Sequence, residues 1–407
     1  MLAESSASKG HQQVLKDINK MSIVRHLCTH PGLSRTGVAA AVELTKSTVS
    51  LLVRELIDEG WLIEHDVVAT GDVGRRPTPL FIDPGRLVLV GAEVGIGGVR
   101  AVAATLTGEI VARARASYRS ASSAKACLTI LANTLTELAG RLDARQQVIG
   151  IGIGVPGAAD EARGHLHFAP NLGWKDVPVA QLLLERFAGT ALATVPLFVQ
   201  NEADVAAVGE MEFNPSDDAD PLLFVSFNQG VGAGVIVERR LLTGHRGYAG
   251  EIGHIVLQPG GPQCTCGRLG CAEALIGTRA VLRGDGDWAD VQHAIEAGNA
   301  TVRRAVDKAA TYFGVLLQNL ATAYDPGRIV LGGAAVQVGE AFLTPALRTF
   351  AGYCEAAGIA PPQVQISRFG ADAVALGAAA LVRYRLTRAP IGGWFIGGRE
   401  PVTEETA

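Results

Sequence analysis

This 407-residue sequence lacks several features that mark whole classes of protein. It has no apolar run of about eighteen residues, the length that a membrane-spanning helix needs. Residues 1–20 lack the basic start and apolar core of a secretion signal, so we expect a cytoplasmic protein with no membrane partner. Positive charge is not in excess either, because the formal net charge is −4. Any affinity for DNA must therefore come from a local patch.

Cysteine is also scarce, and its placement is informative. Of six cysteines, three lie close together as Cys264, Cys266 and Cys271, with His254 just upstream. A large cytosolic chain is not a disulfide scaffold, so this trio favours metal binding. One imidazole and three thiolates form a complete tetrahedral set for Zn²⁺ with no vacant position for water, which predicts a structural zinc site. Reduced, metal-free cysteines are the alternative.

The length predicts two or three domains, and the sequence changes character near residue 85. Before that point, apolar spacing from about residue 14 predicts three short helices followed by a two-stranded hairpin. Ser34 and Thr45 are the expected N-caps of the second and third helices, and Gly60 is expected to end the third. Apolar residues recur in the third helix at i, i+3, i+4 and i+7, as Val49, Leu52, Val53 and Leu56. This order is typical of a winged helix-turn-helix domain, which we place in residues 1–85.

Polar and cationic side chains are expected on the exposed face of the third helix and at the tip of the hairpin. Such side chains donate to phosphate oxygens and base edges, and an arginine pair on a wing fits a narrow minor groove or flanking phosphates. The candidate DNA contacts are Arg35, Lys46, Ser47, Thr48, Ser50, Arg54, Arg75 and Arg76. A protein-interaction module with a solvated charged face is the alternative. We favour DNA because the acids gather away from the start of the helix, at Asp58, Glu59, Glu64 and Asp66.

After residue 85 the sequence becomes rich in valine, alanine and glycine. The stretch "LVLVGAEVGIGGVRAVAATLTGEIV" predicts three strands joined by two tight turns, followed by a helix at about residues 124–142 and a buried strand, "VIGIGIGVPG". A second series of strands, turns and helices starts at "PLLFVSFNQGVGAGVIVERRLLTG". Two such α/β halves resemble the duplicated actin-like ATPase fold of sugar kinases, which holds a ligand between its lobes. We expect a first lobe at residues 86–200 with a returning helix at 372–385, a second lobe at 201–371, and a tail at 386–407.

Several motifs together resemble the ROK family (repressor, open reading frame, kinase). The pattern "SR…ELTKSTVSLLVRELIDEGWL…GRRP" before a glycine-rich body is similar to the repressors of this family, and "C-x-C-G-x-x-G-C-x-E" is present from Cys264 to Glu273. The resemblance covers about residues 15–385. One departure is Glu43, where the family's turn usually has glycine. Glu43 must therefore accept a positive φ or reshape the turn.

The resemblance implies a sugar site beside the cysteine cluster. In the family, the motif "E-x-G-H", the glutamate after the last cysteine and an "E-N-D-A-N" motif contact the sugar. The implied sugar contacts are Asn171, Asn201, Glu202, Glu251, His254 and Glu273. His254 would bind zinc through one ring nitrogen and leave the other for a sugar hydroxyl. The cluster is therefore expected to brace a carbohydrate site.

The positions that serve phosphoryl transfer in the family's kinases are altered. Their "D-x-G-G-T" is "EVGIG" here, with Glu93, Ile96 and Gly97 in place of aspartate, glycine and threonine. The base position is Glu202, one methylene longer than aspartate, and a misplacement of roughly 1 Å costs about 10²-fold in rate. We therefore expect a sugar-responsive repressor that is not an enzyme and has no catalytic residues. An ATP-dependent sugar kinase with an appended DNA-binding domain and a scaffold that binds no DNA are the alternatives.

The expected mechanism involves at least two copies of the chain. A homodimer or higher homo-oligomer would present recognition helices to half-sites of double-stranded operator DNA about 10 bp apart, or a multiple of that. A free monosaccharide effector would close the cleft, reorient the winged domains and release the operator. Xylose is the favoured effector, with glucose and N-acetylhexosamines as alternatives.

Overall fold

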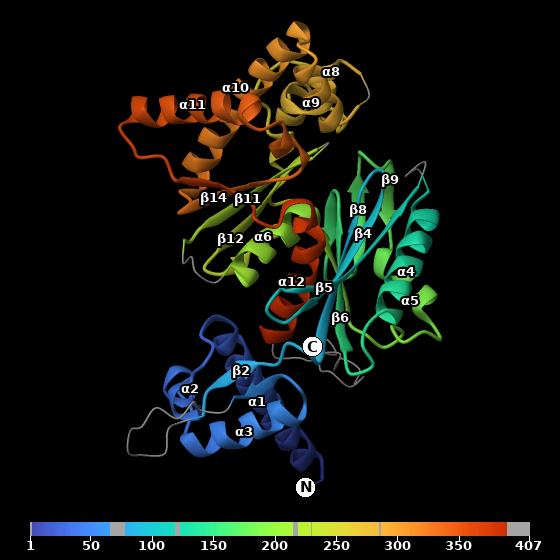
Figure 1. The fold of residues 1–407 in the computed structure, drawn as a ribbon, viewed down its shortest axis with the longest axis vertical. Coiled ribbons are helices and arrows are strands. Elements are labelled where there is room, and N and C mark those ends of the chain that lie inside the picture. Colours follow the sequence, from blue (N-terminus) through green and yellow to red (C-terminus); the bar gives the residue numbers. More distant parts are fainter. Residues whose placement is uncertain are drawn as a thin grey trace.

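The protein is described by a computed structural model that covers residues 2–65, 78–118, 123–214, 219–228, 230–284 and 286–388. Figure 1 shows an N-terminal head, residues 2–65 and 78–82, at one end of a larger two-lobed body. The expected wing tip, with Arg75 and Arg76, lies outside the described residues.

The head contains three helices and a short antiparallel hairpin. Its elements are α1 (Leu2–Thr29), α2 (Arg35–Ala41), α3 (Lys46–Asp58), β1 (Leu62–Glu64) and β2 (Leu80–Ile82). Both predicted N-caps are confirmed, because Ser34 Oγ accepts from the Gly37 N–H and Thr45 Oγ1 accepts from the Thr48 N–H. α1 begins well before the predicted start near residue 14, since apolar spacing marks only the part of a helix that packs.

The turn between α2 and α3 contains a residue with positive φ that is not a glycine. Glu43 has φ +54°, in the left-handed region that glycine adopts at no steric cost. Of the two predicted outcomes, Glu43 therefore accepts the positive φ. Gly60 follows α3 with φ +84°, as predicted for a glycine that ends a helix. The predicted apolar face of α3 is buried.

The first lobe is built on a five-stranded sheet with strand order β10-β6-β3-β4-β5. β3, β4 and β5 are antiparallel neighbours, whereas β6 runs parallel to both β3 and β10. The strands are β3 (Leu87–Val94), β4 (Gly98–Thr105), β5 (Ile110–Ser117), β6 (Gln147–Val155) and β10 (Leu197–Asn201). The lobe also contains a small antiparallel sheet and two helices: β7 (Ala158–Asp160), β8 (His165–Ala169), β9 (Trp174–Val177), α4 (Ala124–Gly140) and α5 (Val179–Phe187).

The second lobe has the same plan, with three antiparallel strands followed by parallel ones in the order β13-β12-β11-β14-β15. The strands are β11 (Leu222–Phe227), β12 (Val231–Val237), β13 (Arg240–Leu241), β14 (Arg328–Gly332) and β15 (Gln363–Ile366). Its helices are α7 (Ala272–Ile276), α8 (Thr278–Leu282), α9 (Trp288–Glu296), α10 (Ala300–Tyr324) and α11 (Glu340–Ala357), with short 3₁₀ turns η1 (Ile252–His254), η2 (Ala334–Val338) and η3 (Gly370–Asp372). The predicted duplicated α/β fold is confirmed.

Two helices, α6 (Glu202–Phe213) and α12 (Ala373–Thr387), lie between the two large sheets (Figure 1). α12 packs on β3 and β6, α6 packs on β11 and β12, and the two helices pack on each other. Glycine permits this close approach. A Cβ on Gly152 would lie 1.9 Å from the Ala378 carbonyl oxygen, and one on Gly209 would lie 2.9 Å from Gly377 Cα. The two lobes therefore meet through a helix pair whose backbones are in close contact.

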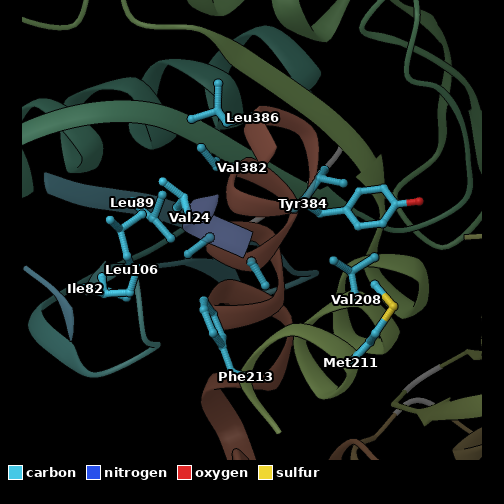
Figure 2. Packing of buried hydrophobic residues seen from close by; sticks show 14 of the residues in the cluster. Val24, Ile82, Leu89, Leu106, Val208, Met211, Phe213, Val382, Tyr384 and Leu386 are labelled. Atoms are coloured by element: carbon cyan, nitrogen blue, oxygen red, sulfur yellow. The ribbon is translucent and has the colours of Figure 1, made fainter. Parts of the chain in front are cut away.

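One hydrophobic cluster joins the head to the body (Figure 2). Val24 of α1 and Ile82 of β2 come from the head, whereas Leu89 and Leu106 come from the first lobe. α6 and α12 supply the other labelled residues, which are Val208, Met211, Phe213, Val382, Tyr384 and Leu386. The head is therefore packed against the helix pair that lies between the lobes.

None of the helices in the described ranges is by itself long and apolar enough to cross a membrane. α2 and α3, which are bent by 113° relative to each other, meet the criteria of length and composition only when they are taken together.

Candidate functional site

The four predicted metal ligands converge on one point. One ligand atom from each of His254, Cys264, Cys266 and Cys271 lies within 4.8 Å of the others. His254 Nδ1 is 3.7 Å from Cys264 Sγ, and Cys266 Sγ is 3.7 Å from Cys271 Sγ. Ligands about 2.3 Å from a tetrahedral Zn²⁺ lie roughly 3.8 Å apart, so this donor set fits the ion. The three thiols are free of disulfides.

A compact loop before α7 holds these ligands in place. The Cys264 N–H donates to the Arg268 carbonyl, and the Gly267 N–H donates to the Cys264 carbonyl, which folds the loop back on itself. Val256 pairs with Cys271 in an antiparallel bridge. This bridge brings the segment that follows His254 against the last cysteine. Backbone hydrogen bonds therefore bring the four donors together.

Glu251 lies on the other side of the His254 ring from the cysteines. His254 Nδ1 faces Cys264, whereas Nε2 is 3.7 Å from Glu251 Oε2. A metal at Nδ1 would leave Nε2 as a hydrogen-bond donor. Burial, and then the nearby Glu273 carboxylate, raise the pKa of Glu251 to about 7. A hydroxyl group placed beside this pair can accept from Nε2 and donate to Oε2.

Glu273 and Asn171 approach each other at Gly230. A Cβ on Gly230 would lie 2.7 Å from Glu273 Oε2 and 3.0 Å from Asn171 Nδ2, so glycine leaves room for both side chains. The Thr265 hydroxyl donates to Glu273 Oε1 at 3.1 Å, and the Val231 N–H donates to Oε2 at 3.3 Å. The Glu273 carboxylate is thus fixed from the cysteine loop on one side and from β12 on the other. The structure brings this carboxylate and the Asn171 amide together.

Most of the hydrogen-bonding groups of the Asn201 side chain already have partners within the protein. Its Oδ1 accepts from the N–H groups of Ala203 and Asp204, which caps α6, and its Nδ2 donates to the Gly157 carbonyl. One amide hydrogen of Asn201 remains for a ligand. The Asn201 side chain therefore serves mainly to cap α6 and to hold its start against Gly157.

Glu202, the first residue of α6, belongs to a cluster of carboxyl groups. Burial raises its pKa to about 8, and the Glu93, Glu251 and Glu273 carboxylates add to this effect. A hydrogen bond with the Asn228 side chain acts in the opposite direction. Two of the other predicted sugar contacts, Glu251 and Glu273, are therefore near enough to influence Glu202 electrostatically.

Asp204 was missed by the sequence reasoning. It is only 3% exposed, and its Oδ1 has no hydrogen-bond partner among the described residues. Burial, followed by the Glu251 and Glu161 carboxylates, raises its pKa well above the ordinary value. The available signal was the last position of the "E-N-D-A-N" motif, which is aspartate here instead of asparagine.

Asn228 was also missed, although it connects two glycine-rich segments. Its Oδ1 accepts from the Ala334 N–H at 2.9 Å, and its carbonyl accepts from Trp288 Nε1 at 2.6 Å. The first bond ties "NQGVGAG" to "LGGAA". Asn228 therefore holds the second lobe's loops at the edge of the candidate site.

A cavity of about 860 Å³ adjoins Asn171 and Glu273. This volume lies in the range of about 300–1,000 Å³ that is usual for ligand pockets. Ile96 lines the cavity from the first lobe, with an apolar side chain where the kinase motif has glycine. The second lobe contributes several cationic residues, which are Arg279, Arg283, Arg304 and Lys308.

Most of the predicted DNA contacts share one face of α3. Lys46, Ser47 and Arg54 are exposed, and Thr48 and Ser50 are half-buried. Leu51 is 53% exposed and lies next to them, since positions 47, 50, 51 and 54 follow the helical repeat. An apolar side chain at such a position suits a thymine methyl group. The sequence reasoning missed Leu51 because it sought polar residues only.

Arg35 has partners within the head. Its Nε and Nη2 both lie 2.9 Å from Glu64 Oε1, and its Nη1 donates to the Ser50 carbonyl at 3.0 Å. Arg35 thus braces α2 against α3 and β1. In this arrangement its guanidinium is engaged inside the head, unlike the exposed Arg54.

Comparison with known proteins identifies both parts of the chain. The ROK family profile matches residues 89–385, and a winged helix-turn-helix DNA-binding profile matches residues 16–63. The chain belongs to the ROK family. The xylose repressor of Caldicellulosiruptor bescii is 28% identical to this ROK protein over 394 residues, which cover 92% of this chain and 97% of the repressor. The glucokinase of Halalkalibacterium halodurans is 31% identical over 317 residues, which cover 72% of this chain and 94% of the kinase.

A solved structure has the same arrangement of domains. It is that of a ROK family transcriptional regulator, a homologue of the E. coli MLC protein, with a TM-score of 0.73 and 22% identity. The match covers 92% of this ROK protein and 97% of the regulator. At this identity the likeness concerns the fold. The predicted family and fold class are confirmed.

Proposed function

We propose that this ROK protein is a cytoplasmic, sugar-responsive transcriptional repressor that binds double-stranded operator DNA and is released by a free monosaccharide. The observation that carries the proposal is the presence, in one chain, of a winged helix-turn-helix head and a ROK body. The similarity to the xylose repressor extends over 92% of the chain, whereas that to the glucokinase extends over 72%. The wider coverage favours a repressor over a kinase. Because that relative is a xylose repressor, we favour xylose as the effector, with glucose and N-acetylhexosamines as alternatives.

The proposed sugar site is a set of acceptors and donors with fixed directions. His254 lies between the cysteine loop and Glu251, and Thr265 of that loop donates to Glu273. The Asn171 amide lies near Glu273 at Gly230. Raised pKa values keep some of the clustered carboxyl groups protonated near pH 7, and a neutral carboxyl group both donates and accepts. Such a cluster suits the uncharged hydroxyl groups of a sugar. It therefore supports a sugar as the effector.

We propose Zn²⁺ as a structural cofactor of this site. His254, Cys264, Cys266 and Cys271 would hold it, and the ion would supply cross-linking of the loop without taking part in a reaction. His254 Nε2 is then left to donate toward Glu251 and the sugar. Thr265, which lies between two of the cysteines, orients Glu273.

The same residues support the loss of phosphoryl transfer. Gly97 offers no hydroxyl for phosphate, and Ile96 places an apolar group on the cavity wall. Glu202 stands where the kinase motif has an aspartate and is one methylene longer, which displaces its oxygens from the position of that base. A sugar kinase is the second candidate, and the 31% identity to a glucokinase favours keeping it in the test.

α6 provides a route from the sugar site to the head. The helix has 12 residues and therefore spans about 18 Å, starting at Glu202 and ending at Phe213 in the cluster shared with the head. Near its end, Glu212 pairs with Arg383 at 2.8 Å and with Arg388 at 2.6 Å. A shift of α6 on sugar binding would move the surface on which the head is docked. In a homodimer this would change the spacing of the two α3 helices.

Operator binding in the presence of single sugars tests the proposal. Duplexes are first selected from a random library with the purified protein, and binding is then measured by fluorescence anisotropy. We expect half-sites about 10 bp apart, or a multiple, and one sugar that weakens binding at least tenfold while its epimers do not. A complete switch requires the sugar to favour the released state by about 5.5 kcal/mol.

Two results would contradict the proposal. Equal operator affinity in the presence of every pentose and hexose would remove the sugar response. Sugar phosphate formed from ATP and Mg²⁺ at roughly 1–100 s⁻¹ would favour the kinase.

A further inference from the structure

A second cavity, of about 870 Å³, lies where the head meets the body. One wall consists of α1 and the end of α2, another of α12, and a third of the turn between β12 and β13. The cavity thus touches the head, the helix that covers the first lobe's sheet, and an edge of the second lobe. Its lining shares no residue with the candidate sugar site.

The face of α1 that lines the cavity is opposite to its face on α3. Lys16 and Lys20 pair with Glu55 of α3, and the same side of α1 carries Ile23 and Leu27 of the head's core. The cavity is instead lined by positions 14, 18, 21 and 25. At 100° per residue these two sets lie about half a turn apart. α1 therefore separates the cavity from the recognition helix.

Basic side chains outnumber acidic ones in the lining of this cavity, which includes Arg25, His26, His30, Arg239, Arg240, Arg385 and Arg388. Asp17 and Glu238 are the acidic residues among the lining. Arg385 pairs with Glu161 and Arg388 pairs with Glu212. Arg25, Arg239 and Arg240 have no ion-pair partner among the described residues. Three guanidinium groups are thus available to a ligand.

These cations lie close enough to affect one another. Burial and the charge of Arg388 lower the pKa of Arg25, Glu212 acts in the opposite direction, and Arg239 lowers it further. His26 stacks on His30 with 4.5 Å between the ring centroids. Clustered cations destabilise the folded chain unless an anion neutralises them.

The turn between β12 and β13 holds two of the arginines in position. Glu238 and Arg239 have φ values of +52° and +56°, a conformation that such hairpin turns usually give to asparagine and glycine. The Glu238 N–H donates to Asp220 Oδ1 at 3.0 Å, and the Leu241 N–H donates to the Tyr384 hydroxyl at 3.3 Å. The second of these bonds fixes the turn to α12. The strained turn therefore keeps Arg239 and Arg240 at the cavity.

We propose that this cavity binds a small anion carrying phosphate or carboxylate groups, held by Arg25, Arg239 and Arg240 and bound independently of the sugar site. Guanidinium groups bind such oxyanions through paired hydrogen bonds. Because the walls belong to the head and to both lobes, a bound anion connects all three parts. It would fix the head relative to the body.

The anion has two possible sources with the same chemistry. One is a free metabolite. The other is the end of this chain, because residues 389–407 follow directly after Arg388 and include Glu400, Glu404 and Glu405. The experiment has to distinguish them.

Titration calorimetry of inorganic pyrophosphate into the full-length protein, at low salt and without DNA, tests the proposal. We expect saturable binding of one pyrophosphate per chain. Arg25→Gln combined with Arg239→Asn should weaken it at least tenfold, whereas Arg303→Gln, on the exposed side of α10, should leave it unchanged. Glu251→Gln should also bind pyrophosphate normally, so failure of this proposal and failure of the sugar site are distinguishable.

The source of the anion is identified with a full-length variant that has glutamine in place of Glu400, Glu404 and Glu405. If wild type binds pyrophosphate as tightly as this variant, the cavity takes a free anion. If the variant binds at least tenfold more tightly than wild type, the end of the chain competes for the cavity. Absence of binding in both proteins would overturn the proposal, as would equal affinities of wild type and the double arginine variant. Melting curves of that double variant verify that it is folded.

Discussion

Glu202 should make the stability of this protein depend on pH. Its pKa in the folded chain is about 8, against 4.5 for an unperturbed glutamate, because of burial and then the Glu93 carboxylate. Between these values the folded chain keeps a proton that the unfolded chain has lost. The stabilisation is therefore complete below about pH 4.5 and disappears as the pH rises to about 8. Glu202→Gln preserves the shape of the side chain and removes this titration.

The raised pKa of Glu202 determines how much the free energy of unfolding changes with pH. In this window each pH unit changes the free energy of unfolding by about 1.4 kcal/mol. Between pH 6 and pH 8 the Glu202 proton therefore accounts for about 2 kcal/mol, since it is half lost at the upper limit. The entropy of unfolding is roughly 2.1 cal/mol/K per residue, so the melting temperature of a chain of this length shifts by about 2 °C.

Calorimetric melting at the two pH values measures this shift. We expect wild type to lose about 2 °C more than Glu202→Gln between pH 6 and pH 8. Glu137→Gln is the matched control, because Glu137 is exposed on α4 and pairs with Arg141 one helical turn away. It should follow wild type. If Glu202→Gln keeps the pH slope of wild type, the buried carboxyl group does not hold a proton and the reasoning is refuted.

Other changes separate the roles of the site, the metal and the head. Glu251→Gln should retain operator binding but lose the response to the sugar in anisotropy titrations; a normal response would remove Glu251 from the site. Cys264→Ser should lose zinc by elemental analysis and weaken sugar binding at least tenfold by calorimetry, and unchanged sugar affinity in the zinc-free protein would contradict the bracing role. Arg54→Ala should weaken operator binding and reduce its salt dependence by about one unit, without affecting sugar binding, whereas Arg303→Ala should change neither. Glu43→Gly should stabilise the head by about 1 kcal/mol by relieving a left-handed residue, and a lower melting temperature would count against that strain.

Features with local signals could be predicted from the sequence. Ser34 and Thr45 cap helices because their hydroxyls reach N–H groups a few positions later, and this spacing is visible in the chain. The apolar repeat of α3 reports one buried face in the same way. The metal ligands could be named because their chemistry and spacing permit few alternatives.

Contacts between distant segments could not be predicted in this way. Arg35 has the charge of a DNA contact, but its partner Glu64 follows 29 positions later in β1. Asp204 lies in a polar part of the sequence, yet it is buried because α6 packs on β11, β12 and α12. Arg383 and Glu212 are 171 positions apart and form a buried pair. In each case the surroundings of the side chain depend on which helices and strands pack together. No local sequence pattern predicts that packing.

The hydrophobic cluster in Figure 2 limits the design of hybrid regulators. A chimaera that joins this body to a foreign head at residue 85 replaces Val24 and Ile82 but keeps Leu106, Phe213 and Val382. Unless the new head offers apolar side chains of matching shape, the surface of the body that contacts the head is left as an exposed apolar patch, which promotes aggregation. Because α12 and α6 also form the core between the two lobes, successful hybrids should keep these helices and give the new head the apolar residues of α1 and β2 that face them.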